Sequence, residues 1–591
     1  MKKLFLTLMA WSLLVSLTFA KSNKVARDLE DKNASDVVDV IVQFRQVPTD
    51  AHHQKVINKG GQFKHELGLV KGGLYSLPAG ALEDLAADPD VAYVSPDRPV
   101  QGLLDYANPT VGADLALGSG WDGNGVGVAL IDSGINDVWD LKVGTSKTQT
   151  RIVYNQSFLA TGTKTSDEFG HGTHVAGILA GNGNYAATWT CSFRVFRGAA
   201  PRAKLINLRV LDANGAGTDS GVISAIQQAV NLKTKYNIRV INLSLGRPVY
   251  ESYKTDPLCQ AVEQAWKAGI VVVAAAGNEG RNNSFGNDGY ATIGSPGNDP
   301  YVITVGAMKT MGTLSRNDDL VASYSSKGPS LLDHVVKPDL VAPGNRIISL
   351  LASKSLLQAK SSVNLVPYSY YQYTSSPGTS CDYFRLSGTS MATPLVSGAA
   401  ALLLQQNPKL TPDQVKARLM KTASKAFPSV SIATDPLTGV IYTSQYDIFT
   451  VGAGYLDVWA ALNNSDLAKG TALSPVAAYD PASGQVGLVY DSSAVWGDSA
   501  VWGNSAVWSN TAVWGNNVFL SGTSAVWGNS AVWGNSAVWG NQSTTAFSAV
   551  WGNSAVWGNG TSGSSSANNT LNAATGVSSP GAVNIAIYGD N

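Results

Sequence analysis

The sequence predicts an α/β protein in which a parallel sheet is covered by helices on both faces. Two observations support this. Between residues 112 and 462, short apolar runs alternate with longer helical segments, the pattern of parallel strands joined by crossover helices. Conspicuous polar residues follow directly after the apolar runs, and open α/β sheets bind their ligands beyond the carboxyl ends of the strands. The central part of the chain, residues 106–463, is therefore expected to carry the function.

Each expected strand is a short run rich in branched apolar residues, and each expected helix is longer. The strands are expected at residues 126–131, 205–211, 240–245, 270–276 and 302–305. The helices are expected at residues 174–180, 219–232, 258–268 and 395–404. The last helix is almost entirely small and apolar, which predicts burial.

The N-terminus has the features of a secretory signal peptide over residues 1–20. Lys2 and Lys3 precede an apolar run over residues 4–19, and small residues around Ala20 provide a cleavage site. A membrane anchor is the alternative, but the run is short for a bilayer span. We therefore expect an extracellular or periplasmic protein.

Residues 21–105 are expected to form a small α+β unit with a linker near residues 103–109. Strands are expected at residues 37–44, 68–77 and 91–95, with helices at 50–59 and 81–87. About sixty residues make a marginal domain on their own. The unit occupies the place of a pro-segment, between a signal peptide and a larger domain. An accessory N-terminal domain is the alternative.

Residues 464–591 differ in composition, and residues 492–559 repeat the hexapeptide Ser-Ala-Val-Trp-Gly-Asn. An even period places the tryptophans of an extended run on one face. Stacked β repeats and a flexible Gly/Ser/Asn-rich tail both fit this pattern. Rows of exposed tryptophan are candidates for contact with a surface or a polymer.

Composition excludes some partners. Charged residues make up 14% of the chain and the formal net charge is zero, which argues against nucleic-acid binding. The cysteines are Cys191, Cys259 and Cys381, which allow at most one internal disulfide and three possible pairings.

Four polar residues together indicate nucleophilic catalysis. Asp132, His171 and Asn278 each have an ordinary reading as turn residues, and Ser390 could simply cap a helix. Their order is what matters. Asp, His and Ser follow one another as in a subtilisin-type triad, and Asn278 carries a side-chain N–H that could bind an oxyanion. The helix start at Ser390 would also favour a developing negative charge.

Other chemistries fit less well. An α/β-hydrolase needs a histidine after its serine, and none follows Ser390. The glycines at 123, 125 and 127 precede a strand, whereas a dinucleotide loop follows one. His171 and His174 resemble a zinc pair, but the Glu of the HExxH motif and a third ligand are missing, so no metal ligands are assigned.

Five sequence blocks make residues 112–462 resemble the subtilases, the subtilisin-like serine proteases. They are VALIDSG, HGTHVAG, INLSLG, AAAGNEG and GTSMATP. The resemblance implies a secreted endopeptidase made as a zymogen. In it, Ser390 is the nucleophile, His171 the general base and Asp132 the residue that orients it, and the Asn278 side chain and the Ser390 N–H form the oxyanion hole.

The resemblance also implies a substrate cleft and partners. Its substrate-binding residues would be Ser244, Leu245 and Gly246, which pair with the substrate backbone, with Ala275, Ala276 and Gly277 opposite. Protein or peptide substrates are expected, with the chain's own pro-segment as inhibitor. His174 would be structural. No catalytic cofactor is implied, and structural calcium is left open because residues 181–197 diverge where some relatives bind it.

Two departures from the family pattern stand out. Leu395 replaces a usual histidine outside the triad, and residues 352–384 look like an insertion with several tyrosines before the nucleophile. A rival hypothesis is a surface-binding protein in which the tryptophan repeats are functional and the protease domain is accessory or inactive.

Overall fold

The computed structural model describes residues 24–96, 106–480, 485–489, 571–573 and 585–590, apart from short gaps at 27–28, 30–31, 161, 188–191, 284–286, 373–377 and 436. The expected signal peptide, the tryptophan repeats, part of the expected linker and Cys191 lie outside these residues. The chain divides into two compact units, residues 1–100 and 101–591.

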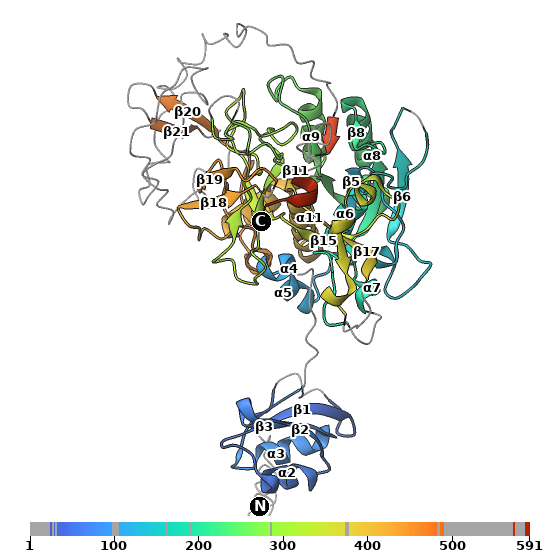
Figure 1. Ribbon diagram of the computed structural model, residues 1–591, viewed down its shortest axis with the longest axis vertical. Helices are drawn as coiled ribbons and strands as arrows, with labels where there is room; N and C mark the ends of the chain where they lie inside the picture. Colours follow the sequence, from blue (N-terminus) through green and yellow to red (C-terminus); the bar gives the residue numbers. More distant parts are fainter. Residues whose placement is uncertain are drawn as a thin grey trace, which may run out of the picture. The chain divides into compact units, whose positions relative to one another are not determined.

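The first unit is a four-stranded antiparallel sheet with two short helices (Figure 1). The strand order is β2-β3-β1-β4. The strands are β1 (Val37–Phe44), β2 (Gln62–Leu67), β3 (Gly72–Pro78) and β4 (Val91–Pro96), and the helices are α2 (Asp50–Ile57) and α3 (Leu82–Ala86). Buried residues alternate along the second half of β1, so one face of the sheet supplies a core of its own. Strand β2 was missed because its sequence, QFKHEL, is polar and exposed.

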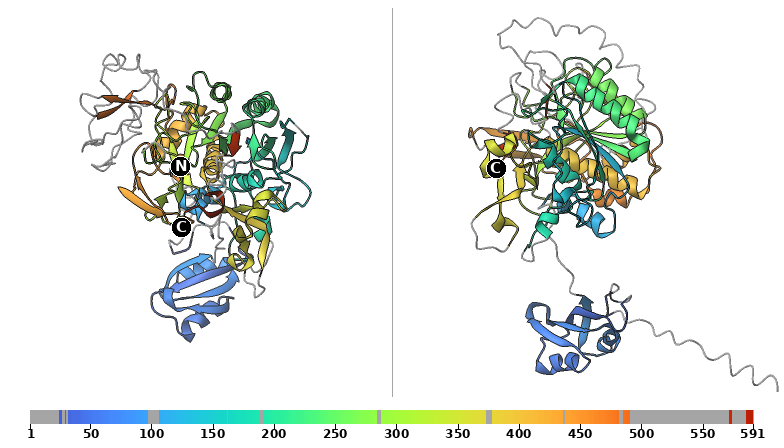
Figure 2. Two further views of the ribbon diagram at one scale, coloured as in Figure 1. Left: turned by 45° about the horizontal axis from the view of Figure 1, so that its top comes forward. Right: turned by 90° about the vertical axis from the view of Figure 1, so that its right-hand side faces the viewer.

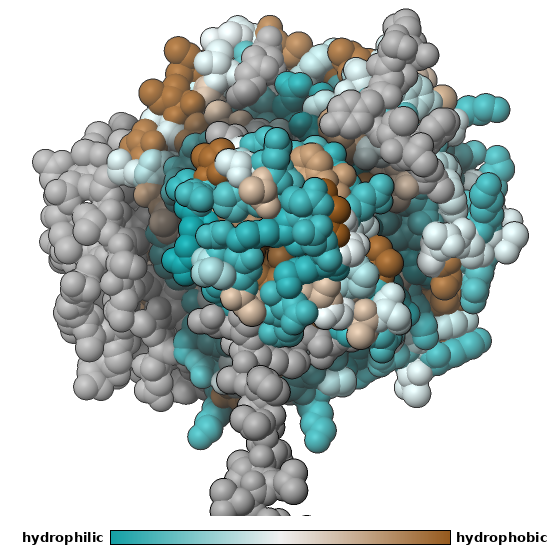
Figure 3. Space-filling model, turned by 90° about the horizontal axis from the view of Figure 1, so that it is seen from below, coloured by the Kyte–Doolittle hydropathy of each residue, from teal (hydrophilic) through white to brown (hydrophobic). Residues whose placement is uncertain are grey.

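Apolar side chains exposed on this unit are scattered. They include Val37, Val47, Ile57 and Phe63. The face of the molecule turned to the viewer in Figure 3 is mostly hydrophilic, with apolar residues dispersed among polar ones. Scattered exposed apolar residues are ordinary for a soluble surface.

The second unit is built on an eight-stranded, predominantly parallel sheet. Its main path is β13-β12-β11-β9-β5-β7-β6, and β14 pairs with β12. The strands are β5 (Gly127–Asp132), β6 (Ile152–Ser157), β7 (Lys204–Arg209), β9 (Ile238–Leu243), β11 (Val271–Ala275), β12 (Ile303–Lys309), β13 (Leu320–Val321) and β14 (Leu340–Pro343). Every pair is parallel except β12 with β13. Strands β5 and β11 are buried throughout, which explains their unbroken apolar sequence.

Helices cover both faces of this sheet, as the right-hand view of Figure 2 shows. Helices α8 (Asp219–Tyr236) and α9 (Pro257–Lys267) pack together on one face. Helices α6 (His171–Ala180) and α11 (Thr389–Gln406) pack together on the other, and α12 (Pro412–Thr422) also belongs to this unit. The predicted fold class is confirmed.

Two helices begin earlier than expected, and both differences concern the site. Helix α6 begins at His171 instead of residue 174, and α11 begins at Thr389 instead of residue 395. The glycines before each start suggested a longer turn. In the structure, Gly170 and Gly388 take positive φ angles of 106° and 146° and lead directly into the helices.

The segment expected as an insertion, residues 352–384, has structure of its own. It contains α10 (Leu356–Lys360), β16 (Leu365–Pro367) and most of β17 (Thr379–Leu386). Strand β17 pairs with both β15 (Ile347–Leu350) and β16. Tyr371 and Tyr383 are buried, whereas Tyr368 and Tyr370 are partly exposed. Tyr373 lies outside the described residues.

The remaining elements are short. They are α4 (Ala107–Thr110), α5 (Ala113–Gly118), α7 (Asn184–Ala187), α13 (Val458–Leu462), β8 (Ala216–Gly217), β10 (Leu245–Gly246), β18 (Val430–Thr434), β19 (Ile441–Gln445), β20 (Val476–Asp480), β21 (Gln485–Val489) and β22 (Leu571–Ala573). Cys259 is a buried free thiol and Cys381 an exposed one. In the described part of the chain, no helix combines the length and the apolar character needed to cross a bilayer.

Candidate active site

The carboxyl ends of three neighbouring parallel strands bring the predicted polar residues to one edge of the sheet. Asp132 ends β5, Ser244 follows β9, and Asn278 lies just beyond β11. His171 and Ser390 stand in the first turns of α6 and α11, which pack against each other. Parallel strands end at the same edge, so residues far apart in sequence meet there.

Asp132 and His171 form a buried pair. Nδ1 of His171 lies 2.8 Å from Oδ1 of Asp132, and both side chains are fully buried. The same carboxylate oxygen accepts the N–H of Ser133 at 2.7 Å. Because a carboxylate accepts, Nδ1 carries the proton and donates it, which leaves Nε2 as the acceptor nitrogen of the neutral ring.

Asp167, which the sequence analysis missed, holds the start of α6 in place. Its Oδ1 accepts from the N–H of Gly170 at 2.7 Å and from Oγ of Ser133 at 2.9 Å, and its Oδ2 accepts from the N–H of Thr173 at 2.8 Å. Burial raises the pKa of this carboxyl group. An aspartate four residues before a helix-starting histidine was the available signal, because acidic residues cap helix N-termini.

Ser390 and Ser244 exchange two hydrogen bonds, each hydroxyl donating to the carbonyl oxygen of the other residue. Oγ of Ser390 donates to the carbonyl oxygen of Ser244 at 3.2 Å, and Oγ of Ser244 donates to the carbonyl oxygen of Ser390 at 2.9 Å. The second bond follows from Pro394, which lies inside α11 and has no N–H to offer the carbonyl four residues before it. The proline thus frees the Ser390 carbonyl for Ser244.

Asn278 is oriented by the residue before the serine. Its Oδ1 accepts from the N–H of Thr389 at 3.0 Å and from Oγ1 of Thr389 at 3.1 Å. Because Oδ1 faces Thr389, the Nδ2 atom of Asn278 points away from Thr389. A Cβ added to Gly388 would lie 3.3 Å from this Nδ2, so a glycine at residue 388 leaves room beside the amide. The contact with Thr389 was not foreseen from the sequence.

The residues predicted to bind substrate lie on two segments around Ser390. Leu245 and Gly246 form β10, and Ala275 ends β11. The N–H of Gly277 donates to Oγ1 of Thr389 at 3.2 Å, which joins the segment of Ala275, Ala276 and Gly277 to the start of α11. The carbonyl oxygen of Ala276 accepts from the N–H of Gly294 at 3.0 Å.

One predicted contact is not formed in this structure. Nε2 of His171 is buried and has no hydrogen-bond partner among the described residues, and Oγ of Ser390 is directed at Ser244. The structure therefore brings Asp132 to His171, Ser244 to Ser390, and Asn278 to Thr389, without a hydrogen bond between the histidine and the serine.

His174 has contacts that suit a structural role. Its Nε2 is 3.1 Å from the carbonyl oxygens of both Ile347 and Phe384, and the ring is fully buried. Burial, followed by the electrostatic effect of neighbouring His171, lowers its pKa to about 3, so the ring stays neutral. In the part of the chain that the structure describes, no three acidic, histidine or cysteine residues gather as a metal site.

The described residues of the stretch at 181–197, where calcium was left open, form hydrogen bonds with neighbouring segments. Nδ2 of Asn184 donates to the carbonyl oxygen of Gly144 at 2.7 Å. The nearby carboxylate of Asp140 already accepts from the N–H of Tyr185 at 2.7 Å and from the hydroxyl of Tyr383 at 2.9 Å. Calcium needs six to eight oxygen ligands. Both carboxylate oxygens of Asp140 already accept hydrogen bonds from protein donors.

The sequence profile described as "Subtilase family" matches residues 123–445, which contain all of the candidate-site residues. The chain belongs to the subtilase family. As a subtilase it is a subtilisin-like serine protease, so the predicted enzyme class is confirmed.

Similar curated subtilases come from several bacilli. Serine protease AprX of Bacillus subtilis (strain 168) is 39% identical over 340 residues, which are 56% of this chain and 68% of that protein. Subtilisin E of the same strain is 33% identical over 431 residues, 72% of this chain and 94% of that protein. Alkaline elastase YaB of Bacillus sp. (strain YaB) is 31% identical over 362 residues, 61% of this chain and 76% of that protein.

Proposed function

We propose that this subtilase hydrolyses peptide bonds through Asp132, His171 and Ser390, by way of an acyl-enzyme. The observation that carries the proposal is the buried hydrogen bond from His171 to Asp132, because it fixes the tautomer a general base needs. Ser390 lies in the first turn of the adjacent helix α11. Its reaction requires a rotation of Oγ from Ser244 towards Nε2 of His171.

Each residue then has a definite task. Ser390 Oγ attacks the carbonyl carbon while His171 Nε2 takes its proton, and the imidazolium is stabilised by Asp132. The proton passes to the leaving amine, and water hydrolyses the ester. Nδ2 of Asn278 and the N–H of Ser390 stabilise the oxyanion, an arrangement supported by the orientation that Thr389 gives to Asn278.

The proposal extends to how the enzyme is made. Residues 1–20 direct export, and residues 21–105 act as an inhibitory pro-segment that is removed by cleavage near residues 103–109. Support comes from the sequence of the N-terminus and from the separate core of the first unit. Substrate binding by Ser244, Leu245 and Gly246 opposite Ala275, Ala276 and Gly277 belongs to the same proposal.

Labelling with a fluorophosphonate tests the catalytic roles directly. The purified wild-type protein should take up label at Ser390 and hydrolyse a soluble peptide. Ser390→Ala should do neither, and His171→Ala should react at least about a thousandfold more slowly, because triad members act as a unit. Label on the Ser390→Ala protein, or rapid turnover by His171→Ala, would contradict the assignment. The maturation step is checked by whether Ser390→Ala keeps residues 21–105.

A further inference from the structure

A strand from the far C-terminal part of the chain lies between two segments of the active-site edge. Strand β22 (Leu571–Ala573) forms the centre of a three-stranded sheet in the order β10-β22-β8. It pairs antiparallel with β10 (Leu245–Gly246) on one side and with β8 (Ala216–Gly217) on the other. Its backbone therefore occupies the place beside Leu245 and Gly246 that the proposed function gives to a substrate.

The register gives this strand a direction. Ala573 is opposite Leu245 and Asn572 is opposite Gly246, whereas Leu571 is opposite Gly217. Because the pairing with β10 is antiparallel, the carboxyl end of β22 is directed towards Ser244. Ser244 is the residue that exchanges two hydrogen bonds with Ser390. Strand β22 thus has the direction that the acyl side of a substrate would have.

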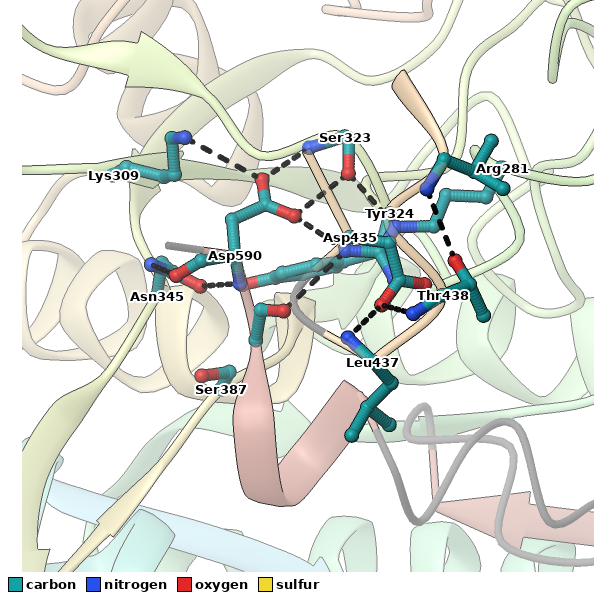
Figure 4. A network of polar contacts seen from close by, with 12 residues as sticks. Arg281, Lys309, Ser323, Tyr324, Asn345, Ser387, Asp435, Leu437, Thr438 and Asp590 are labelled. Carbon is teal, nitrogen blue, oxygen red and sulfur yellow. Dashed lines mark hydrogen bonds and ion pairs between the residues drawn. The ribbon is translucent and has the colours of Figure 1, made fainter. Parts of the chain in front are cut away.

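The end of the chain is held by a second contact with the same unit. The side chain of Asp590 is fully buried and accepts from the N–H and from Oγ of Ser323, both at 2.7 Å (Figure 4). It also pairs with Nη2 of Arg281 at 2.5 Å and with Nζ of Lys309 at 3.8 Å. Its backbone exchanges two hydrogen bonds with the side chain of Asn345, at 2.9 and 3.1 Å.

Residues 585–590 also contact Ser387, in the segment just before Ser390. The N–H of Ser387 donates to the carbonyl oxygen of Ala586 at 2.9 Å, and Nδ2 of Asn364 donates to the carbonyl oxygen of Ile587 at 2.8 Å. Gly589 has a φ of 61°, and a Cβ there would lie 2.3 Å from Oγ of Ser387. The fit needs glycine, so residues 585–590 are seated closely against the protease body.

Burial of the catalytic side chains agrees with an occupied site. Both His171 and Ser390 have 0% relative exposure, and Asn278 has 3%. A protease that acts on external proteins must expose its nucleophile to them. In the full chain, a segment that is already bound has the first opportunity to react.

From these contacts we propose that the C-terminal segment around β22 is a substrate of the enzyme that carries it, cleaved within the same molecule on the carboxyl side of Ala573 and before residue 585. The proposal rests on the catalytic roles proposed above. One peptide bond is broken and one water is consumed. The Ser390 proton passes through His171 to the leaving amine, and the products are a new C-terminal carboxylate and a released fragment that contains residues 585–591.

Proline substitutions in the full-length chain test this pairing. Asn572→Pro removes an N–H from the centre of β22, where a sheet tolerates proline poorly, and Asn569→Pro is the matched change outside β22. Mass spectrometry would follow the C-terminus with time. Release of the fragment should slow by about tenfold or more in Asn572→Pro, as expected for lost backbone hydrogen bonds, and should be nearly unchanged in Asn569→Pro. Equal rates in the two variants would overturn the proposal.

Dilution separates cleavage within one molecule from cleavage between molecules. The fraction of wild-type chain cut in a given time should stay constant over a hundredfold dilution, and added wild-type enzyme should cut Ser390→Ala far more slowly. A rate that rises with concentration would overturn the proposal. A wild-type protein that labels at Ser390 yet keeps Asn591 overturns only this inference. If neither the wild type nor Asn572→Pro takes up the fluorophosphonate at Ser390 or hydrolyses the peptide, the proposed function is overturned together with this inference.

Discussion

Nδ1 of His171 lies 2.8 Å from Oδ1 of Asp132, and solvent reaches neither side chain. In water an ion pair of this kind contributes little, but away from water the carboxylate controls which nitrogen carries the proton. This contact is what the proposed role of His171 as a base requires. His174 in the same helix is the internal comparison, because its Nε2 faces the carbonyl oxygens of Ile347 and Phe384 instead.

Asp132→Asn should leave the fold intact and lower kcat by about 10⁴-fold, because the amide can hold the ring in the wrong tautomer. Steady-state kinetics on a soluble peptide measure the loss, and circular dichroism checks the fold. Ser133→Ala is a neighbouring control, since its side chain bonds to Asp167 and to the N–H of Gly172 and not to the histidine ring. Loss of less than tenfold in Asp132→Asn would contradict the role given to Asp132.

Asn278→Ala should lower kcat by about 10²–10³-fold with KM changed by less than about threefold, the effect known for the oxyanion asparagine of a subtilisin. Asn278→Asp is the matched variant, because it keeps the acceptor for Thr389 and lacks the N–H donor. Both variants should be impaired. An active Asn278→Asp enzyme would show that the donor is not used.

Asp167→Ala should destabilise the protein by about 3 kcal/mol, because the donors at Gly170, Thr173 and Ser133 would lose a buried acceptor. Thermal unfolding in a Ser390→Ala background, which prevents self-digestion, measures the change. Ser166→Ala, at the exposed neighbouring residue, is the control and should have little effect. Equal melting temperatures for the two variants would argue against Asp167 as the residue that holds the start of α6.

The lowered pKa of His174 predicts that the protein loses stability in acid. The folded-state pKa of the ring is lowered to about 3 from an ordinary value of 6.5, mainly by burial. As pH falls below 6.5, the unfolded chain binds a proton that the folded chain does not, so the free energy of unfolding decreases down to about pH 3. The full effect is about 5 kcal/mol, from a difference of about 3.5 pH units at about 1.4 kcal/mol per unit.

Denaturant unfolding at several pH values, again with Ser390→Ala, compares His174 with His174→Gln. Glutamine keeps an N–H for the carbonyl oxygens of Ile347 and Phe384 but does not titrate. The difference in stability between the two proteins should shrink or reverse from pH 7 to pH 4. Parallel curves would mean that His174 is not buried as a neutral ring.

The sequence by itself determined the sheet class, and it singled out Asp132, His171, Asn278 and Ser390 as the candidate catalytic residues. Each follows an apolar strand or begins a helix, and such signals are local, because the alternation of strands and helices is written in consecutive residues. The early starts of α6 and α11 were missed, since Gly170 and Gly388 look like parts of longer turns until their φ angles are known.

Only the tertiary structure decided the contacts between distant segments. It showed that Pro394 frees the Ser390 carbonyl for Ser244, that Asp167 holds the start of α6, and that β22 pairs with β10 and β8. The physical reason is that backbone pairing and burial depend on which segments meet in space. The sequence of a strand as short as Leu571–Ala573 does not predict which strand it pairs with. Its pairing beside Gly246 is therefore known only from the folded structure.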